Sequence, residues 1–299
     1  MEIMVALIKS LRPKQWIKNL FIFAGIVFAG KFFVPEALYS VLSAFGLFCA
    51  TSSGIYILND IIDLPHDREH PVKRKRPIAS GQFPLPVAKL SAGILLVGAL
   101  TLAFLLSTNL GLIIALYVIT HIAYSLYLKR IVILDVLIVA FGFLLRVIAG
   151  AVVIPVTISS WLLVCTILIS LFLILAKRRQ EIIISPEGES RPVLQEYSLS
   201  FIDQIISAIA ASTITAYSLY AFSGETIQKF GGRYMGYTIP FVLYGILRYL
   251  YLIHKRSLGE EPEKILLTDP PFIINLGLWI LTVFIIVYFF AEEGAFIEK

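Results

Sequence analysis

Residues 59–81, NDIIDLPHDREHPVKRKRPIASG, gather acidic and basic side chains directly after a long apolar run. Positions i, i+1, i+4 and i+8, which share roughly one helix face, are Asn59, Asp60, Asp63 and Asp67. Clustered carboxylates repel one another unless a cation lies between them, and Mg²⁺ often bridges carboxylates to substrate phosphates. The pattern therefore predicts that the three aspartates bind Mg²⁺, with Mn²⁺ as an alternative ion. A solvated acidic helix end at a membrane surface is the competing interpretation.

The second half of this segment supplies the opposite charge. Pro65 predicts that the helix kinks or ends, and a basic run follows, consisting of Lys73, Arg74, Lys75 and Arg76. A basic cluster beside a membrane can simply bind anionic lipid head groups, but that interpretation leaves the neighbouring aspartates unexplained. Metal-binding acids next to phosphate-binding bases form a matched set for a diphosphate with its Mg²⁺ ion. The segment therefore predicts a site for a polyphosphate ester at a membrane surface.

The composition indicates an integral membrane protein, because 58% of the 299 residues are hydrophobic and 15% are charged. In soluble domains, roughly 45–50% of the residues are apolar and about 25% are charged. A membrane-spanning helix needs about 20 mostly apolar residues. Nine segments are expected to span: Asn19–Val34, Ala37–Leu58, Leu85–Leu106, Leu110–Leu128, Ile131–Val153, Ser160–Ala176, Ile202–Phe222, Met235–Ile253 and Phe272–Phe290. The chain is expected to form one polytopic all-α domain over residues 1–299.

The distribution of positive charge predicts the orientation in the membrane. Most of the 25 Lys and Arg residues fall between the expected helices on one side of the membrane when the N-terminus is placed inside, in agreement with the positive-inside rule. We therefore expect a multi-pass protein of the plasma membrane with a cytoplasmic N-terminus and an external C-terminus. The long polar loops lie on the cytoplasmic side, where the chemistry is expected. No nucleic-acid partner is expected. The sequence does not determine the oligomeric state, and a homo-oligomer is one of the alternatives.

The N-terminal segment LRPKQWIKN carries further bases just before the first expected helix. Lys14 and Lys18 are candidate phosphate ligands. The alternative is that Trp16 and these bases form an anchor at the membrane interface, where tryptophan is common.

Two ionisable residues fall within an expected membrane helix, where they are costly and often functional. Asp135 is one turn into the helix near the inner face, and it either bonds ribose hydroxyls or pairs with Lys129 or Arg130. Arg146 is deeper in the same helix and either braces neighbouring helices or contacts the substrate.

The motif NDIIDLPHD followed by RPIASG resembles the first aspartate-rich motif of the UbiA superfamily of intramembrane prenyltransferases. The resemblance implies nine transmembrane helices around a polar cavity that opens to the cytoplasmic face. Members usually carry a second motif of the type DxxxD after the sixth helix. The corresponding segment here, KRRQEIIISPEGESRPVLQEY, lacks DxxxD and is rich in bases. This departure favours a second phosphorylated substrate over a neutral aromatic acceptor.

Several motifs together are similar to one branch of the superfamily, the decaprenyl-phosphate phosphoribosyltransferases. They are LRPKQWIKN, DREHPVKRKRPIASG, YSLYLK, LDVLIVAFGFLLRVIAG and KRRQE. The resemblance implies transfer of 5-phosphoribose from 5-phosphoribosyl diphosphate to a polyprenyl (decaprenyl) phosphate, with release of pyrophosphate. The product would supply the lipid-linked pentose donor for cell-wall arabinan. The alternatives are a polyprenyl or aromatic prenyltransferase of the same superfamily and, from another class, a lipid transporter.

The resemblance also implies roles for individual residues. Mg²⁺ would be held by the three aspartates and would neutralise the diphosphate. The expected catalytic residues are Asp60, Asp63, Asp67 and Arg76. The expected substrate-binding residues are Lys14, Lys18, Asn59, Lys73, Arg74, Tyr124, Lys129, Asp135, Arg146, Lys177, Arg178, Glu181 and Tyr197.

Overall fold

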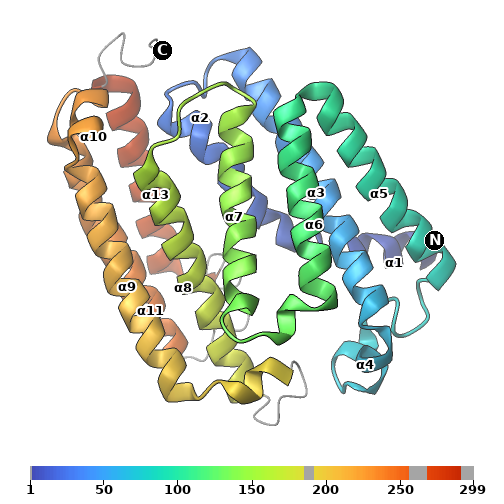
Figure 1. Cartoon of the computed structure of the whole chain (residues 1–299). Coiled ribbons are helices and arrows are strands. Elements are labelled where there is room, and N and C mark those ends of the chain that lie inside the picture. Colours follow the sequence, from blue (N-terminus) through green and yellow to red (C-terminus); the bar gives the residue numbers. More distant parts are fainter. Residues whose placement is uncertain (1, 185–191, 256–267, 291–299) are drawn as a thin grey trace.

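The computed structural model describes residues 2–184, 192–255 and 268–290, and this part of the chain contains helices and no strand (Figure 1). The α-helices are α1 (Glu2–Leu11), α2 (Ala24–Phe28), α3 (Pro35–Ile62), α4 (Leu64–Glu69), α5 (Leu85–Leu106), α6 (Thr108–Leu126), α7 (Leu134–Val152), α8 (Ser160–Ile184), α9 (Leu199–Ala221), α10 (Gly224–Lys229), α11 (Ile239–Lys255) and α13 (Pro270–Ile285). The 3₁₀ segments are η1 (Pro13–Phe23), η2 (Lys73–Lys75), η3 (Leu128–Arg130), η4 (Pro192–Glu196) and η5 (Arg233–Thr238), and the π-helical turn η7 (Ile286–Phe290) ends the described chain.

Eight helices in the described residues are long and apolar enough to cross a membrane. They are Pro35–Ile62, Leu85–Leu106, Thr108–Leu126, Leu134–Val152, Ser160–Ile184, Leu199–Ala221, Arg233–Lys255 and Pro270–Phe290. Each overlaps one of the nine expected spans. The first expected span, Asn19–Val34, differs: it consists of the end of η1, the five-residue helix α2 and a turn.

The spans stand side by side as a bundle, with α4 at one end and α2 and α10 at the opposite end (Figure 1). The two largest apolar clusters in the described residues form most of the interior. One joins η1, α2, α3, α5, α6 and α7, and the other joins α7, α8, η4, α9 and α11. Helix α7 contributes to both clusters and is therefore central to the bundle. Its two charged residues, Asp135 and Arg146, consequently contact several other elements.

The segment η1 lies in backbone contact with α7, and one glycine makes this approach geometrically feasible. A Cβ atom at Gly150 would lie 1.8 Å from the carbonyl oxygen of Ile22. No side chain fits in that space, so any other residue would push η1 away from α7. The close approach matters for the site because η1 follows directly on Arg12 and carries Asn19.

Candidate active site

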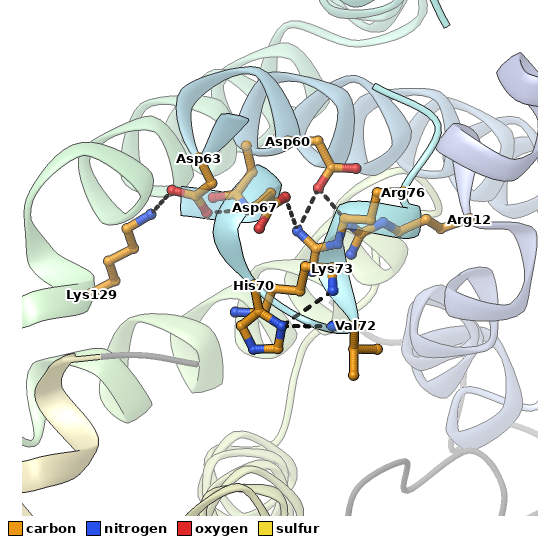
Figure 2. A network of polar contacts seen from close by, with 10 residues as sticks. Arg12, Asp60, Asp63, Asp67, His70, Val72, Lys73, Arg76 and Lys129 are labelled. Atoms are coloured by element: carbon orange, nitrogen blue, oxygen red, sulfur yellow. Dashed lines mark hydrogen bonds and ion pairs between the residues drawn. The ribbon is translucent and has the colours of Figure 1, made fainter. Parts of the chain in front are cut away.

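The aspartate-rich motif lies where α3 passes into α4, at one end of the bundle (Figure 2). Helix α3 ends at Ile62, and Pro65 is in the first turn of α4, so the expected kink is confirmed at Asp63. Asp60 and Asp67 are buried, with 2% and 3% of their surface exposed, whereas Asp63 is half-buried. Because α4 turns back after Asp63, two carboxylates separated by seven residues come to face the same basic side chain.

That basic side chain is Arg76, which follows η2. Its Nη1 atom lies 3.0 Å from Asp60 Oδ1 and 2.7 Å from Asp67 Oδ2 (Figure 2). Burial raises the pKa of the Asp67 carboxyl above its ordinary value, and the positive charge of Arg76 acts in the opposite direction. The guanidinium therefore offsets the repulsion between two buried carboxylates.

A second arginine reaches the same cluster from the N-terminal segment. Arg12 Nη2 donates to Asp60 Oδ1 at 2.5 Å, and the Arg12 guanidinium also lies 5.2 Å from the centre of the Tyr56 ring. Arg12 was not among the residues assigned to the site from the sequence, although it belongs to the LRPKQWIKN motif. Only the contact across 48 residues shows that this motif and the aspartate motif form one site.

Asp63 points towards different partners. Its Oδ2 atom accepts a hydrogen bond from Asn59 Nδ2 at 3.1 Å, and its Oδ1 atom lies 2.5 Å from Lys129 Nζ (Figure 2). Lys129 belongs to η3, between α6 and α7. The contact therefore connects the end of α3 to the start of α7 and brings the predicted residues Asn59 and Lys129 into the site.

The aspartates do not converge on a single point in this arrangement, and no group of three or more His, Cys, Asp or Glu residues in the described ranges does so. The donor chemistry nevertheless fits a divalent ion. One nitrogen of Arg76 lies within hydrogen-bonding distance of both Asp60 and Asp67, so a cation already lies between them. Carboxylate oxygens are the ligands that Mg²⁺ prefers. For Asp63 to join these ligands, its carboxylate must turn away from Lys129.

A second polar cluster lies at the same end of α7. Asp135 is completely buried and accepts two hydrogen bonds, from Arg178 Nε at 2.9 Å and from Tyr197 Oη at 2.8 Å. Arg178 also donates to Glu181 Oε2 at 2.6 Å and to Tyr124 Oη at 3.4 Å. Five predicted substrate-binding residues from α6, α7, α8 and the segment after η4 are thus brought together around one ion pair.

One expectation about this cluster is wrong. Asp135 does not pair with Lys129 or Arg130, because Lys129 reaches Asp63 and the carboxylate is held by Arg178. The carboxylate is also held by Tyr197, whose pKa is raised to about 12 by burial, with a further contribution from its hydrogen bond to Asp135. Sequence proximity was a poor guide here, since Arg178 is 43 residues away but lies on the helix packed against α7.

The remaining predicted bases are distributed around these clusters, and they are Lys14, Lys18, Lys73, Arg74 and Lys177. Lys14 and Arg74 are exposed, whereas the other three are half-buried. Lys18 Nζ donates to Gln15 Oε1 at 2.5 Å. Lys73 is close enough to Asp67 for its positive charge to act, together with Arg76, against the rise in the pKa of that carboxyl.

Arg146 lies in the interior of the bundle and braces it. Nε donates to Asn19 Oδ1 at 2.7 Å, Nη1 to the Gly142 carbonyl at 2.7 Å and Nη2 to Tyr117 Oη at 2.9 Å. The side chain is 4% exposed and joins η1, α6 and α7. This arrangement agrees with the bracing role, one of the two alternatives for this residue. Asn19 was not recognised from the sequence because nothing local marks its partner.

Next to Arg178 and Arg179 on α8, Gln180 is buried but incompletely bonded. It is 4% exposed, and its Oε1 atom has no hydrogen-bond partner among the described residues. Its neighbour Arg179, in contrast, bonds to Asp203 at 2.6 Å and to the Ile253 carbonyl at 3.3 Å. A buried amide oxygen without a donor is uncommon in native structures.

The chain is similar to named proteins over almost its whole length. A protein of Mycolicibacterium smegmatis named decaprenyl-phosphate phosphoribosyltransferase is 36% identical over 95% of this chain and 92% of its own length. A protein of the same name from Mycobacterium tuberculosis is 32% identical over 94% of both chains.

Solved structures show the same fold. A UbiA homologue from Archaeoglobus fulgidus, solved with GPP and Mg²⁺, superposes with a TM-score of 0.70 at 18% identity and covers 94% of this chain and 99% of that one. Residues 19–275 match the model of the UbiA prenyltransferase family. This range includes the whole aspartate motif with its partners Arg76 and Lys129, and the ion pair of Asp135 with Arg178. The chain is a multi-pass membrane protein and belongs to the UbiA prenyltransferase family.

Proposed function

We propose that this protein transfers 5-phosphoribose from 5-phosphoribosyl diphosphate to a polyprenyl phosphate, with release of pyrophosphate. The observation that carries the proposal is the joint presence of two clusters at one end of the bundle. One is the acidic and basic cluster of Asp60, Asp67 and Arg76, and the other is centred on Arg178. The names of relatives that are 32–36% identical over almost the whole chain support the same activity.

The first cluster is suited to the diphosphate of the donor. Asp60, Asp63 and Asp67 would hold a divalent ion, Mg²⁺ or Mn²⁺, which neutralises the diphosphate charge and assists departure of pyrophosphate when it is bound. Arg76 lies among these carboxylates and can exchange them for phosphate oxygens, which guanidinium groups bind well. Lys73 and Arg74, in the adjacent turn, are positioned in the sequence to bind the same group.

The second cluster distinguishes this chain from a prenyltransferase with an aromatic acceptor. Arg178 occupies the segment where superfamily members usually carry DxxxD, and its guanidinium is held by Asp135 and Glu181. Tyr197 in turn donates to Asp135. A rigidly held cation at this position suits a phosphate group, either of the lipid or of the ribose. Lys177, one residue earlier, and Lys18 are the candidate bases for the other phosphate.

The reaction requires little proton transfer from the protein. A polyprenyl phosphate is already an anion and can attack C1 of the ribose without a strong general base. The protein must therefore hold two mutually repelling anions in line and stabilise the leaving group. Basic side chains at separate positions, Arg76 in the first cluster and Arg178 in the second, can hold the two anions apart before the bond forms.

The orientation in the membrane follows from a ninth crossing formed by η1 and α2. Eleven 3₁₀ residues at about 2.0 Å each and five α-helical residues at about 1.5 Å each extend about 30 Å, the thickness of the hydrocarbon core. The start of η1 lies beside Ser53 in the second half of α3, from where Arg12 reaches Asp60 near the end of that helix, and α2 lies at the opposite end of the bundle (Figure 1). The N-terminus and the aspartates would then share the cytoplasmic side of the plasma membrane, with the site opening there.

The test uses purified protein in lipid nanodiscs with radiolabelled 5-phosphoribosyl diphosphate and decaprenyl phosphate. We expect labelled lipid and pyrophosphate in equal amounts, with no product in excess EDTA and recovery on addition of Mg²⁺. A parallel reaction with a prenyl diphosphate and an aromatic acceptor tests the alternative activity. Product only in the parallel reaction, or full activity in EDTA, would contradict the proposal.

A further inference from the structure

Helix α1 is apolar on two opposite faces. On one face, Ala6 and Ser10 are buried, and Ala6 packs in a cluster with Ile57 of α3 and Ala88 of α5. The opposite face exposes three large apolar side chains, Met4, Val5 and Ile8, each with about half or more of its surface accessible. A helix with such a face on the outside of a protein requires a partner that is itself apolar.

The membrane is the partner that the surroundings of α1 indicate. In Figure 1, α1 runs across the direction of the spans, close to the start of α5. Helix α5 carries Ala88 on the face towards α1 and exposes Leu90, Ile94 and Val97 along its outer side. The exposed face of α1 therefore belongs to a helix that packs directly against a membrane span whose outer side is apolar. Lys9 is exposed on α1 itself, as expected for a helix lying at the level of the head groups.

The end of α1 is hydrogen-bonded to α3, the helix that carries Asp60. The carbonyl of Leu11 accepts from Ser53 Oγ at 2.9 Å, and Ser53 Oγ accepts from Trp16 Nε1 at 3.0 Å. Between Leu11 and Trp16, Arg12 adopts φ 53° and ψ 59°, a left-handed conformation that is unfavourable for a residue with a side chain. The surrounding contacts must maintain this conformation, and it directs the guanidinium to Asp60.

We propose that the exposed face of α1 is an in-plane membrane anchor, which lies among the lipid head groups and upper acyl chains on the side of the aspartates. By holding α1 against α3, the lipid keeps Arg12 over Asp60. Arg12 is thus a positioning residue whose contact depends on the seating of α1 in the bilayer. The part of this inference that concerns activity rests on the proposed function, whereas the part that concerns membrane contact does not.

Spin-label accessibility tests the membrane contact directly. A nitroxide is attached at Met4→Cys in a Cys165→Ala background, since Cys49 is buried, and the protein is reconstituted in lipid vesicles. Labels at Val97→Cys in the middle of α5 and at Glu69→Cys at the end of α4 serve as deep and aqueous references. We expect the Met4 label to be accessible to oxygen and only partly to a water-soluble nickel complex, at a depth between the two references.

Two results would overturn the anchor. A Met4 label as accessible to the nickel complex as the Glu69 label would place α1 in water. A label shielded from both reagents, with a short distance between labels on two chains, would show that a second copy covers this face.

The link to Arg12 is tested by the pair Met4→Glu/Ile8→Glu, with Met4→Leu/Ile8→Leu as the matched apolar control. In vesicles, we expect the glutamate pair to raise KM for the phosphoribosyl donor at least fivefold and the leucine pair to leave it unchanged. In an Arg12→Gln background, the glutamate pair should change KM by less than twofold, because the residue through which α1 acts is gone. The link would be contradicted if the effects of Arg12→Gln and of the glutamate pair on KM multiplied when combined. It would also be contradicted if the glutamate pair alone had the KM of the wild type. If the wild type shows no phosphoribosyl transfer, the accessibility result still decides the anchor.

Discussion

Arg76 lies 2.7 Å from Asp67 through Nη1, the nitrogen that also bonds to the next carboxylate of the motif. This arginine therefore holds a position between two buried carboxylates where a divalent cation is expected. Under the proposed function, the same side chain would compete with the metal in the absence of substrate and would bind the diphosphate in its presence. Its removal should have opposite effects on the two processes.

We accordingly expect Arg76→Gln to bind Mn²⁺ more tightly than the wild type in the absence of substrate, by about tenfold or more. Loss of the guanidinium leaves two carboxylates whose repulsion a metal ion relieves. The free Mn²⁺ signal in electron paramagnetic resonance measures this affinity, and the transfer assay should show a loss of at least a hundredfold. Arg68→Gln, at an exposed position on α4, is the matched control and should change neither quantity. Weaker Mn²⁺ binding by Arg76→Gln would show that the arginine supports the metal site.

Breaking the ion pair of Asp135 with Arg178 should be strongly destabilising. Both side chains are almost fully buried, at 0% and 3% exposure. A buried charge left without any partner costs about 3–5 kcal/mol, and because Glu181 still pairs with Arg178 at 2.6 Å, we expect a cost at the lower end of that range. Asp135→Asn should therefore lower the thermal midpoint markedly in detergent. The neighbouring pair of Arg179 with Asp203 provides the control, because Asp203 is about one-third exposed. Asp203→Asn should cost about 1 kcal/mol or less.

If Asp203→Asn destabilised the protein more than Asp135→Asn, that result would contradict this account of the second cluster. A change in substrate KM without loss of stability in Asp135→Asn would instead indicate that Asp135 contacts the ribose directly.

The raised pKa of Tyr197 predicts a specific dependence of stability on alkaline pH. The folded-state pKa is about 12, above the ordinary value of about 10, so the unfolded chain loses its proton first. The stabilising contribution of Tyr197 is complete below about pH 10 and is lost as pH rises to 12. The difference in thermal midpoint between the wild type and Tyr197→Phe should therefore narrow between pH 9.5 and 11.5. Tyr127→Phe, at an exposed position, should show no such narrowing, and an unchanged difference for Tyr197→Phe would contradict the prediction.

Gln180→Met should stabilise the protein. The buried carbonyl oxygen of Gln180 lacks a donor among the described residues, and leaving such a group unpaired costs about 1–3 kcal/mol. Methionine has a similar length and no strong acceptor. We expect a gain of about 1 kcal/mol, measured as a shift of the thermal midpoint in detergent, whereas Gln204→Met at an exposed position should be neutral. A loss of stability in Gln180→Met would show that the amide has a structural partner.

Much of the fold and part of the site follow from local sequence. The long spans overlap the expected segments because a run of about 20 apolar residues has few alternatives to a transmembrane helix. The three aspartates and Arg76 were recognised because they lie within 17 consecutive residues, 60–76. The kink at Asp63 followed from Pro65, whose effect on a helix is also local.

Only the tertiary structure decided which charges pair. Three ion pairs join residues that are far apart in the sequence: Arg12 with Asp60 (48 residues), Lys129 with Asp63 (66 residues) and Arg178 with Asp135 (43 residues). Whether the two members of each pair meet in space depends on how closely the helices approach. The backbone contact of η1 with α7 at Gly150 is one example. Hydropathy specifies that a segment is buried in lipid or protein, but it carries no information about rotation or depth, and a rotation by one residue directs a charged side chain to a different neighbour.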